Sequence, residues 1–440
     1  MNKYSRIAIL LLVIALSLQV TNLHMPYPNT ETYIIGFYEN VVTQSTVHDL
    51  ITHYNLSNPY IYSSINGMSA NIQSDQLPTL QNDPRIAFIE QNTLQYNAAQ
   101  EIPTGMQRIF ATMNINLAID NIDDRRVDVD VAILDSGIDF HHPDLNVVGG
   151  TNCVSPDDEP LPDTYCQLDG EGGNYDDYNY HGTHVAGIVG ALDNDFGIVG
   201  VAPGARLWAV KVMNEDYGAK TTDVIAAIDW VIQRGDIEVI NLSLYSWGYS
   251  LGYETAIEAA VEAGITVVVA AGNESDDASN YGPANIPSAI TVSAIADYDG
   301  LDGSLSTTPY PELNGCPDYT DDSLADFSNW GDIVDIAAPG TCILSTIPVE
   351  YGGYEHVKGT SMAAPHVTGA VAILASQGYT PLEIEDILKT EGNYKWTDTS
   401  GDDTQEPLLD ISNLEFFSPI FLEEIPKTPT PSPTRRSSPK

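Results

Sequence analysis

The feature that most constrains this chain is a regular alternation of short apolar runs and longer amphipathic segments between about residues 127 and 390. The runs VDVAIL, RLWAVKVM, EVINLSL and ITVVVAA have the length and composition of strands that are buried on both faces. The segments TTDVIAAIDWVIQRG and YETAIEAAVEAG place apolar residues at helical spacing and end at glycine. This alternation predicts an α/β domain with a mostly parallel sheet and helices on both faces. In such a sheet we expect the chemistry at the carboxyl ends of the strands.

Both ends of the chain look like segments outside the packed domains. Lys3 and Arg6 precede an apolar run at residues 7–18, which is too short to favour a membrane-spanning helix and fits a secretory signal. We therefore predict a signal peptide at residues 1–24 and a secreted, extracellular protein. An uncleaved segment, which would make the protein membrane-anchored, remains the alternative. The Pro/Ser/Thr-rich end, PKTPTPSPTRRSSPK, predicts a disordered tail at residues 413–440.

Charge is concentrated in the middle of the chain. Residues 99–410 hold 10 Lys or Arg against 52 Asp or Glu, a net charge of −42. A surface of this sign repels nucleic acids and anionic membranes, so we expect neither as a partner.

The chain has four cysteines, Cys153, Cys166, Cys316 and Cys342, compatible with two disulfides in an exported protein. Four cysteines allow three connectivities, and the sequence does not choose among them. We favour Cys153–Cys166, which closes an acidic loop, and Cys316–Cys342. A structural zinc site is the alternative, but no C-x-x-C spacing supports it.

Two segments place acid–base groups next to predicted elements. VDVAIL runs into DSGIDFHHPDL, so Asp135 follows a buried strand, where it either caps a turn or serves catalysis. HGTHVAGIVGAL predicts a helix with His181 at its entrance and His184 one turn later. The spacing does not match the zinc-protease pattern, which needs i, i+4 histidines and a glutamate. We therefore interpret His184 as a core residue and His181 as the reactive candidate.

Two further segments supply the other groups that a nucleophilic mechanism needs. VVVAAGNES ends a strand at Asn273, which either turns the chain or aims an N–H group at a developing oxyanion. HVKGTSMAAPHVTGAVAIL predicts a helix with Ser361 in its first turn, near the positive end of the helix dipole. Asp, His and Ser occur here in one of the known chain orders of the serine-hydrolase triad.

The segments VAILDSGI, HGTHVAGIVGA, AAGNES and GTSMAAPHVTGAVAIL together closely resemble the four signatures of the subtilisin-like serine proteases. The resemblance implies a secreted serine endopeptidase that hydrolyses peptide bonds of protein or peptide substrates through an acyl-enzyme. It assigns Asp135 as the orienter of His181, His181 as general base, Ser361 as nucleophile and Asn273 as oxyanion donor. A catalytically silent binding protein of the same shape is the alternative, disfavoured because all four residues are present.

The resemblance extends upstream and covers roughly residues 31–412. The stretch from about residue 31 to 92 is similar to the family's inhibitory propeptide, a small α+β domain that would act as an intramolecular inhibitor, and we assign this domain to residues 25–98. Two strand-like segments in it flank the helix-like SDQLPTLQND at residues 74–83. AAQEIP looks like a mature N-terminus, so we expect self-processing near Ala98 and Ala99 and a catalytic domain at residues 99–412, acting as a monomer. An unrelated N-terminal binding domain is the alternative.

A calcium site is implied by ALDNDFGIVGVAP, which resembles the family's calcium loop. All its donors would be oxygen atoms, as calcium requires. A plain turn is the alternative. The implied ligands are the carbonyl groups of Leu192, Phe196 and Ile198 and the side chains of Asn194, Asp144 and Gln100.

One departure from the family concerns substrate binding, which the resemblance assigns to Ser243, Leu244, Tyr245 and Gly272. Tyr245 and Ser246 stand where the family usually has two glycines, so a broad preference for large apolar residues is in doubt. The acidic insertion at residues 152–179 is interpreted as a solvated loop, with a second calcium site as the alternative.

Overall fold

The computed structural model divides into two compact units, Met1–Gln95 and Tyr96–Lys440. The predicted signal peptide and most of the predicted tail lie outside the described residues. Those residues are 30–38, 44–62, 65–73, 76–91, 99–156, 165–167, 174–214, 218–303, 319–414 and 420–421.

The first unit is a small α+β fold, as predicted. Its four strands form an antiparallel sheet in the order β2-β3-β1-β4. Apolar residues of the sheet and helices form one core around Ile35, Leu50 and Met68. The helix expected at residues 74–83 is present as α3, whereas α2 was not anticipated. The elements are β1 (Thr30–Phe37), α2 (Gln44–His53), β2 (Ser57–Ile61), β3 (Gly67–Gln73), α3 (Leu77–Gln81) and β4 (Ile86–Gln91).

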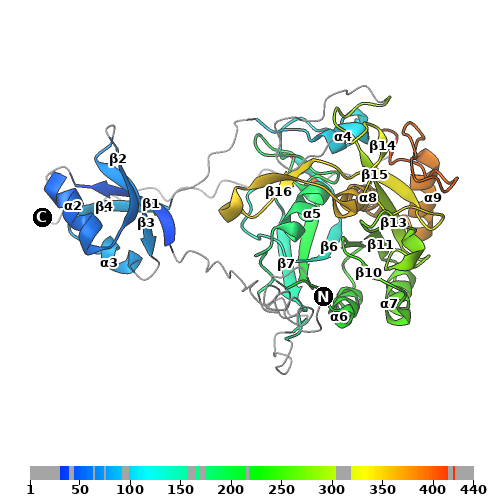
Figure 1. Cartoon of the computed structure of the whole chain (residues 1–440), viewed down its shortest axis with the longest axis horizontal. Coiled ribbons are helices and arrows are strands. Elements are labelled where there is room, and N and C mark those ends of the chain that lie inside the picture. The colour runs from blue at the N-terminus through cyan, green and yellow to red at the C-terminus, as the bar shows by residue number, and fades with distance from the viewer. Residues whose placement is uncertain are drawn as a thin grey trace, which may run out of the picture. The chain divides into compact units, whose positions relative to one another are not determined.

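The second unit is built on a sheet in the order β14-β13-β11-β9-β6-β8-β7, with β15 also paired to β13 (Figure 1). Every pair in it is parallel except β13 with β14. The predicted mostly parallel sheet is therefore confirmed. The strands are β6 (Asp130–Asp135), β7 (Val147–Asn152), β8 (Arg206–Lys211), β9 (Val239–Leu242), β11 (Thr266–Ala270), β13 (Ile290–Ala296), β14 (Ser323–Leu324) and β15 (Ile336–Pro339).

Helices cover both faces of this sheet because successive strand residues point to opposite sides. Along β6, Val131 and Ile133 join the core that contains α5 (His181–Gly190) and α8 (Thr360–Ala375). Ala132 and Leu134 join the other core, with α6 (Thr221–Arg234) and α7 (Leu251–Glu262). Two cores on one sheet explain why the strands are apolar throughout.

The remaining elements are short or lie at the margins of the second unit. Ile420–Phe421 (β18) pairs with Arg125–Arg126 (β5), a pairing that the composition of the tail does not predict. Within the described residues, no helix has both the length and the apolar character to cross a membrane. The other elements are α4 (Thr104–Arg108), η1 (Ala111–Met113), β10 (Ser246–Trp247), η2 (Ala278–Asn280), β12 (Tyr281–Gly282), β16 (Ile343–Thr346), η3 (Val349–Tyr351), β17 (Tyr354–Val357) and α9 (Pro381–Glu391).

One of the two expected disulfides lies within the described residues. Cys153 and Cys166 are bonded, with their Cα atoms 4.6 Å apart. The expected partner of Cys342, Cys316, lies outside the described residues, so that pairing stays a prediction.

Candidate active site

Three neighbouring parallel strands end at the same edge of the sheet and deliver the candidate residues. The strands β6, β9 and β11 lie side by side in that order. Asp135 is the last residue of β6, Ser243 follows β9, and Gly272 and Asn273 follow β11. The candidate site therefore lies at the carboxyl edge, where the fold class predicts it.

Asp135 and His181 are paired at this edge. His181 Nδ1 lies 2.8 Å from Asp135 Oδ1, and Asp135 is fully buried. The helix α5 approaches β6 closely because its second residue is Gly182. A Cβ atom there would stand 2.1 Å from the carbonyl oxygen of Gly137. The small-residue start of α5 is thus what brings the imidazole to the carboxylate.

Asp177, which was not among the residues predicted from the sequence, is a buried aspartate that fixes the start of α5. Asp177 is 2% exposed, and its carboxylate accepts hydrogen bonds from the backbone N–H groups of Asn179, Tyr180 and Thr183. It also accepts from Ser136 Oγ at 2.9 Å. The interpretation of residues 152–179 as a solvated loop is therefore wrong at this end. The only sequence signal was the position of Asp177, four residues before His181.

The two histidines of α5 have opposite electrostatic environments. Burial lowers the pKa of His181, but the Asp135 carboxylate outweighs it, so the pKa ends above its usual value. Burial lowers the pKa of His184 to about 3. His184 Nε2 lies 3.0 Å from the carbonyl oxygen of Ile343. His184 is therefore a neutral core residue, as interpreted, whereas His181 can accept and hold a proton.

Ser361 lies in the first turn of α8, where backbone N–H groups have no partner within the helix. Its side-chain Oγ donates to the carbonyl oxygen of Ser243 at 3.2 Å rather than to His181. Ser243 Oγ in turn donates to the carbonyl oxygen of Ser361 at 2.8 Å. Hydrogen bonds between catalytic groups are often long or poorly aligned before substrate binds, so this contact does not exclude Ser361 as the candidate nucleophile.

The amide of Asn273 is fixed by the residue that precedes Ser361. Asn273 Oδ1 accepts from the backbone N–H and from the hydroxyl of Thr360, both at 2.9 Å. Since Oδ1 is occupied, the Nδ2 group is left for another acceptor. Thr360 Oγ1 also accepts from the N–H of Gly272 at 3.2 Å. Thr360 therefore orients the candidate oxyanion donor.

Gly359 keeps open the space between two candidate oxyanion donors. Its φ is +145°, a region that favours glycine. A Cβ atom at this position would stand 3.7 Å from both Asn273 Nδ2 and the backbone nitrogen of Ser361. Both N–H groups therefore lie beside the position that a side chain at residue 359 would occupy.

Tyr245 spans the two segments that flank the candidate nucleophile. Its hydroxyl donates to Glu274 Oε1 at 2.9 Å. Its ring carbon Cδ2 would lie 3.4 Å from a Cβ atom placed on Gly272. Leu244, by contrast, packs against the core on the α6 and α7 side. The structure thus brings Ser243, Tyr245 and Gly272 together beside Ser361, while Leu244 contributes mainly to packing.

Asp144 is at the centre of the predicted calcium loop. It is fully buried, and its carboxylate accepts from Asn194 Nδ2 at 2.7 Å, the N–H of Ile198 at 2.9 Å and Tyr354 OH at 3.1 Å. Burial raises its pKa to about 6. Burial therefore disfavours the ionised form of Asp144, and a cation bound beside it would stabilise that form.

Gln100 meets the same loop from the start of the second unit. Its Nε2 donates to the carbonyl oxygens of Leu192 at 2.9 Å and Ile198 at 3.4 Å. Gln100 Oε1 is buried without a hydrogen-bond partner among the described residues. The backbone of Phe196 is tied to Asn194, whose Oδ1 accepts its N–H at 2.9 Å. Rotation of the two amides would turn this arrangement into a cluster of oxygen atoms, so the residues fit a hard cation.

A parallel α/β sheet with an Asp–His pair at its carboxyl edge and a serine at a helix start is typical of serine peptidases. Comparison with known proteins agrees with this class. Residues 127–407 match the model of the Subtilase family, Peptidase_S8. The chain therefore belongs to the subtilase family and is a subtilisin-like serine endopeptidase.

Relatives and a solved structure show how far the likeness extends. Subtilisin E of Bacillus subtilis (strain 168) is 34% identical over 370 residues, covering 82% of this chain and 85% of that protein. An alkaline protease of Shouchella clausii is 30% identical over 372 residues, with the same coverage. A crystal structure of a cold-adapted subtilisin-like serine proteinase matches with a TM-score of 0.50 and 31% identity, covering 66% of this chain and 90% of that one.

Proposed function

We propose that the protein is a secreted, calcium-stabilised endopeptidase, made as a precursor that cleaves itself, with Asp135, His181 and Ser361 as its triad. The observation that carries this proposal is the 2.8 Å contact between His181 Nδ1 and Asp135 Oδ1, and Ser361 in the first turn of α8 supports it. An ionised carboxylate can only accept, so Nδ1 carries the proton and Nε2 keeps its lone pair. His181 is then in the tautomer that a general base needs.

The chemistry follows from these positions. Ser361 Oγ attacks the substrate carbonyl carbon while His181 Nε2 takes its proton, and the carbonyl oxygen becomes negatively charged. Asn273 Nδ2 and the Ser361 N–H donate to this oxygen, and loss of one such donor costs about 10²–10³-fold in kcat in serine hydrolases. His181 then protonates the leaving amine, and water hydrolyses the acyl-enzyme by the reverse proton path.

Calcium would be held by Gln100, Asp144, Leu192, Asn194, Phe196 and Ile198. When bound, it supplies positive charge to a buried carboxylate and stabilises the folded state by mass action. It takes no part in catalysis. Support comes from the buried, partnerless Gln100 Oε1 and from the raised pKa of Asp144.

Secretion and self-processing rest on the first 98 residues. The apolar run at residues 7–18 supports export, and the Cys153–Cys166 disulfide fits an oxidising compartment. The α+β unit that ends at Gln95 supports a separate inhibitory propeptide, because the proposed mature N-terminus follows within a few residues.

The test compares the purified full chain with Ser361→Ala. We expect the parent to hydrolyse a peptide substrate and to shorten itself near Ala99, and Ser361→Ala to do neither, as read by N-terminal sequencing. Trimming of Ser361→Ala in a protease-free preparation would contradict self-processing. A parent without peptidase activity would contradict the proposed function itself.

A further inference from the structure

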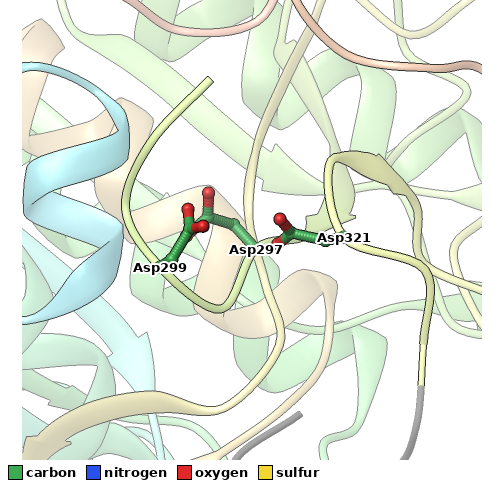
Figure 2. A group of neighbouring side chains, drawn as sticks. All are labelled: Asp297, Asp299 and Asp321. Carbon is green, nitrogen blue, oxygen red and sulfur yellow. The ribbon is translucent and has the colours of Figure 1, made fainter. Parts of the chain in front are cut away.

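A cluster of carboxylates outside the proposed active site lies where β13 meets β14. Asp297 directly follows β13, Asp299 comes two residues later, and Asp321 precedes β14. The antiparallel pairing of β13 with β14 brings these distant segments together. One carboxylate oxygen from each residue lies within 4.8 Å of the others. Figure 2 shows the three side chains gathered at this point.

The cluster is buried and lies in a strongly acidic segment. Asp297 is 2% exposed and Asp321 is 4% exposed, while Asp299 is partly buried. Residues 297–322 contain seven Asp or Glu and no Lys or Arg. Carboxylates brought this close in a buried place repel one another strongly unless positive charge lies nearby.

Arg108 contacts this cluster at Asp297, while the backbone N–H groups of Tyr298 and Leu301 donate to Asp321 and Asp299. Arg108 Nε donates to Asp322 Oδ1 at 2.7 Å, and its Nη2 donates to the carbonyl oxygen of Lys395 at 2.7 Å. Asp297 Oδ2 lies 3.2 Å from the same Nε. The single hydrogen on Nε is directed at Asp322, however, so Asp297 Oδ2 is left buried without a hydrogen bond.

The surroundings of Asp297 disfavour its ionised form. Its other oxygen accepts from the N–H of Gly300 at 2.8 Å. Burial raises the pKa of Asp297, the N–H of Gly300 and the charge of Arg108 lower it, and the carboxylates of Asp322 and Asp321 raise it again, so that the pKa ends at about 8. A buried carboxylate oxygen without a hydrogen bond, close to two further carboxylates, is an arrangement that a bound cation would complete.

We propose that Asp297, Asp299 and Asp321 bind a divalent cation, calcium by preference, at a site separate from the one at Asp144. All three donors are oxygen atoms, which hard cations prefer. Oxygen separations of up to 4.8 Å suit calcium, whose bonds are about 2.3–2.6 Å long, better than magnesium, whose bonds are about 2.0–2.1 Å. The bound ion joins the segment after β13 to the segment before β14, and so stabilises this edge of the sheet without touching the proposed catalytic residues.

The test counts bound ions and does not depend on catalysis. It uses full-length Ser361→Ala, stripped of metal and kept at pH 8, so that self-cleavage plays no part. Calcium chloride is titrated by calorimetry, and terbium is titrated with luminescence excited through tyrosine, since the buried Tyr298 adjoins Asp297. We expect Asp299→Asn to bind one ion fewer than its parent. The matched control is Asp302→Asn, a neighbouring aspartate outside the trio that is paired with Lys395 at 2.7 Å, and it should bind the same number as the parent.

A second variant keeps the test decisive if Asp299→Asn folds poorly. Asp144→Asn removes a central ligand of the other proposed site, so one ion should still bind and give tyrosine-excited terbium emission. Equal stoichiometry and affinity in Asp299→Asn and its parent would overturn the proposal. So would the absence of any ion bound to folded Asp144→Asn.

Discussion

His181 Nδ1 lies 2.8 Å from Asp135 Oδ1, although 46 residues separate the two in the chain. The contact joins the last residue of β6 to the first residue of α5. Because only His181 has this contact, it differs in pKa from His184, which lies one helical turn later. His184 has carbonyl oxygens as neighbours and a pKa lowered to about 3, whereas the pKa of His181 is raised because a carboxylate faces it.

The first prediction concerns this pair. Asp135→Asn keeps the size of the side chain but favours the wrong imidazole tautomer, so kcat should fall about 10⁴-fold. KM should change little, because Asp135 is buried and touches no substrate. Steady-state kinetics on a peptide substrate measures both constants. A fall in kcat of less than tenfold would exclude Asp135 as the orienter of His181.

The second prediction concerns pH. His181 works as a base only when neutral, and its pKa lies above the usual 6.5, so kcat/KM should rise with pH through an inflection above 6.5. In Asp135→Asn the residual activity should show its inflection at lower pH, because the charge that raises the pKa is gone. The contribution of His181 to folding stability changes with pH in the opposite direction to kcat/KM. The protonated imidazole stabilises the fold below about pH 6.5, and this contribution is lost as pH rises through the folded-state pKa.

The third prediction concerns substrate choice. Tyr245 joins the segments after β9 and β11 through Glu274 and Gly272, so we expect it to limit the substrate side chain next to the cleaved bond. Tyr245→Gly should raise kcat/KM for substrates with Phe or Leu at that position by about tenfold or more, relative to Ala. The exposed neighbour Ser246 provides the control, and Ser246→Gly should leave the ratio unchanged. An unchanged ratio in Tyr245→Gly would show that Tyr245 does not restrict the substrate.

The fourth prediction joins calcium to the net charge of −42 in residues 99–410. Screening lengths fall from about 10 Å at 0.1 M salt to about 3 Å at 1 M, so molar sodium chloride alone should raise the thermal midpoint of Ser361→Ala. A chelator should lower the midpoint by roughly 5–10 °C at low salt and by less at molar salt.

The effect of calcium on the thermal midpoint should also depend on pH. Protons compete with calcium for Asp144, whose pKa is raised to about 6, so calcium should raise the midpoint more at pH 8 than at pH 5. Calorimetric melts under these conditions provide the measurement, and midpoints indifferent to salt, chelator and pH would refute this account.

Much of the fold and the candidate site was predictable because it depends on local patterns. The apolar runs became β6, β8, β9 and β11, and the glycine-ended segments became α6 and α7. Strand ends at one edge of a parallel sheet converge, so Asp135 and Asn273 could be assigned from the sequence beside them. The predicted Cys153–Cys166 disulfide is also confirmed, although the spacing alone did not exclude the other connectivities.

What could not be predicted depends on long-range packing. Asp177 lies in a segment whose acidic composition indicates solvent exposure, yet five hydrogen-bond donors surround its carboxylate once α5 packs on β6. The cluster of Asp297 and Asp321 exists only because β14 returns to pair with β13. The closeness of Gly359 to the side chain of Asn273 likewise depends on packing between distant segments.

The most direct test of the central claim is covalent labelling of the nucleophile. Ser361 reacts with a fluorophosphonate only if His181 takes its proton, so a label that is mapped by mass spectrometry reports the whole arrangement. We predict a single modified residue, Ser361, in the parent, and none in Ser361→Ala or in a parent unfolded beforehand. Labelling at another residue, or no labelling of the folded parent, would contradict the assignment of Ser361 as the nucleophile.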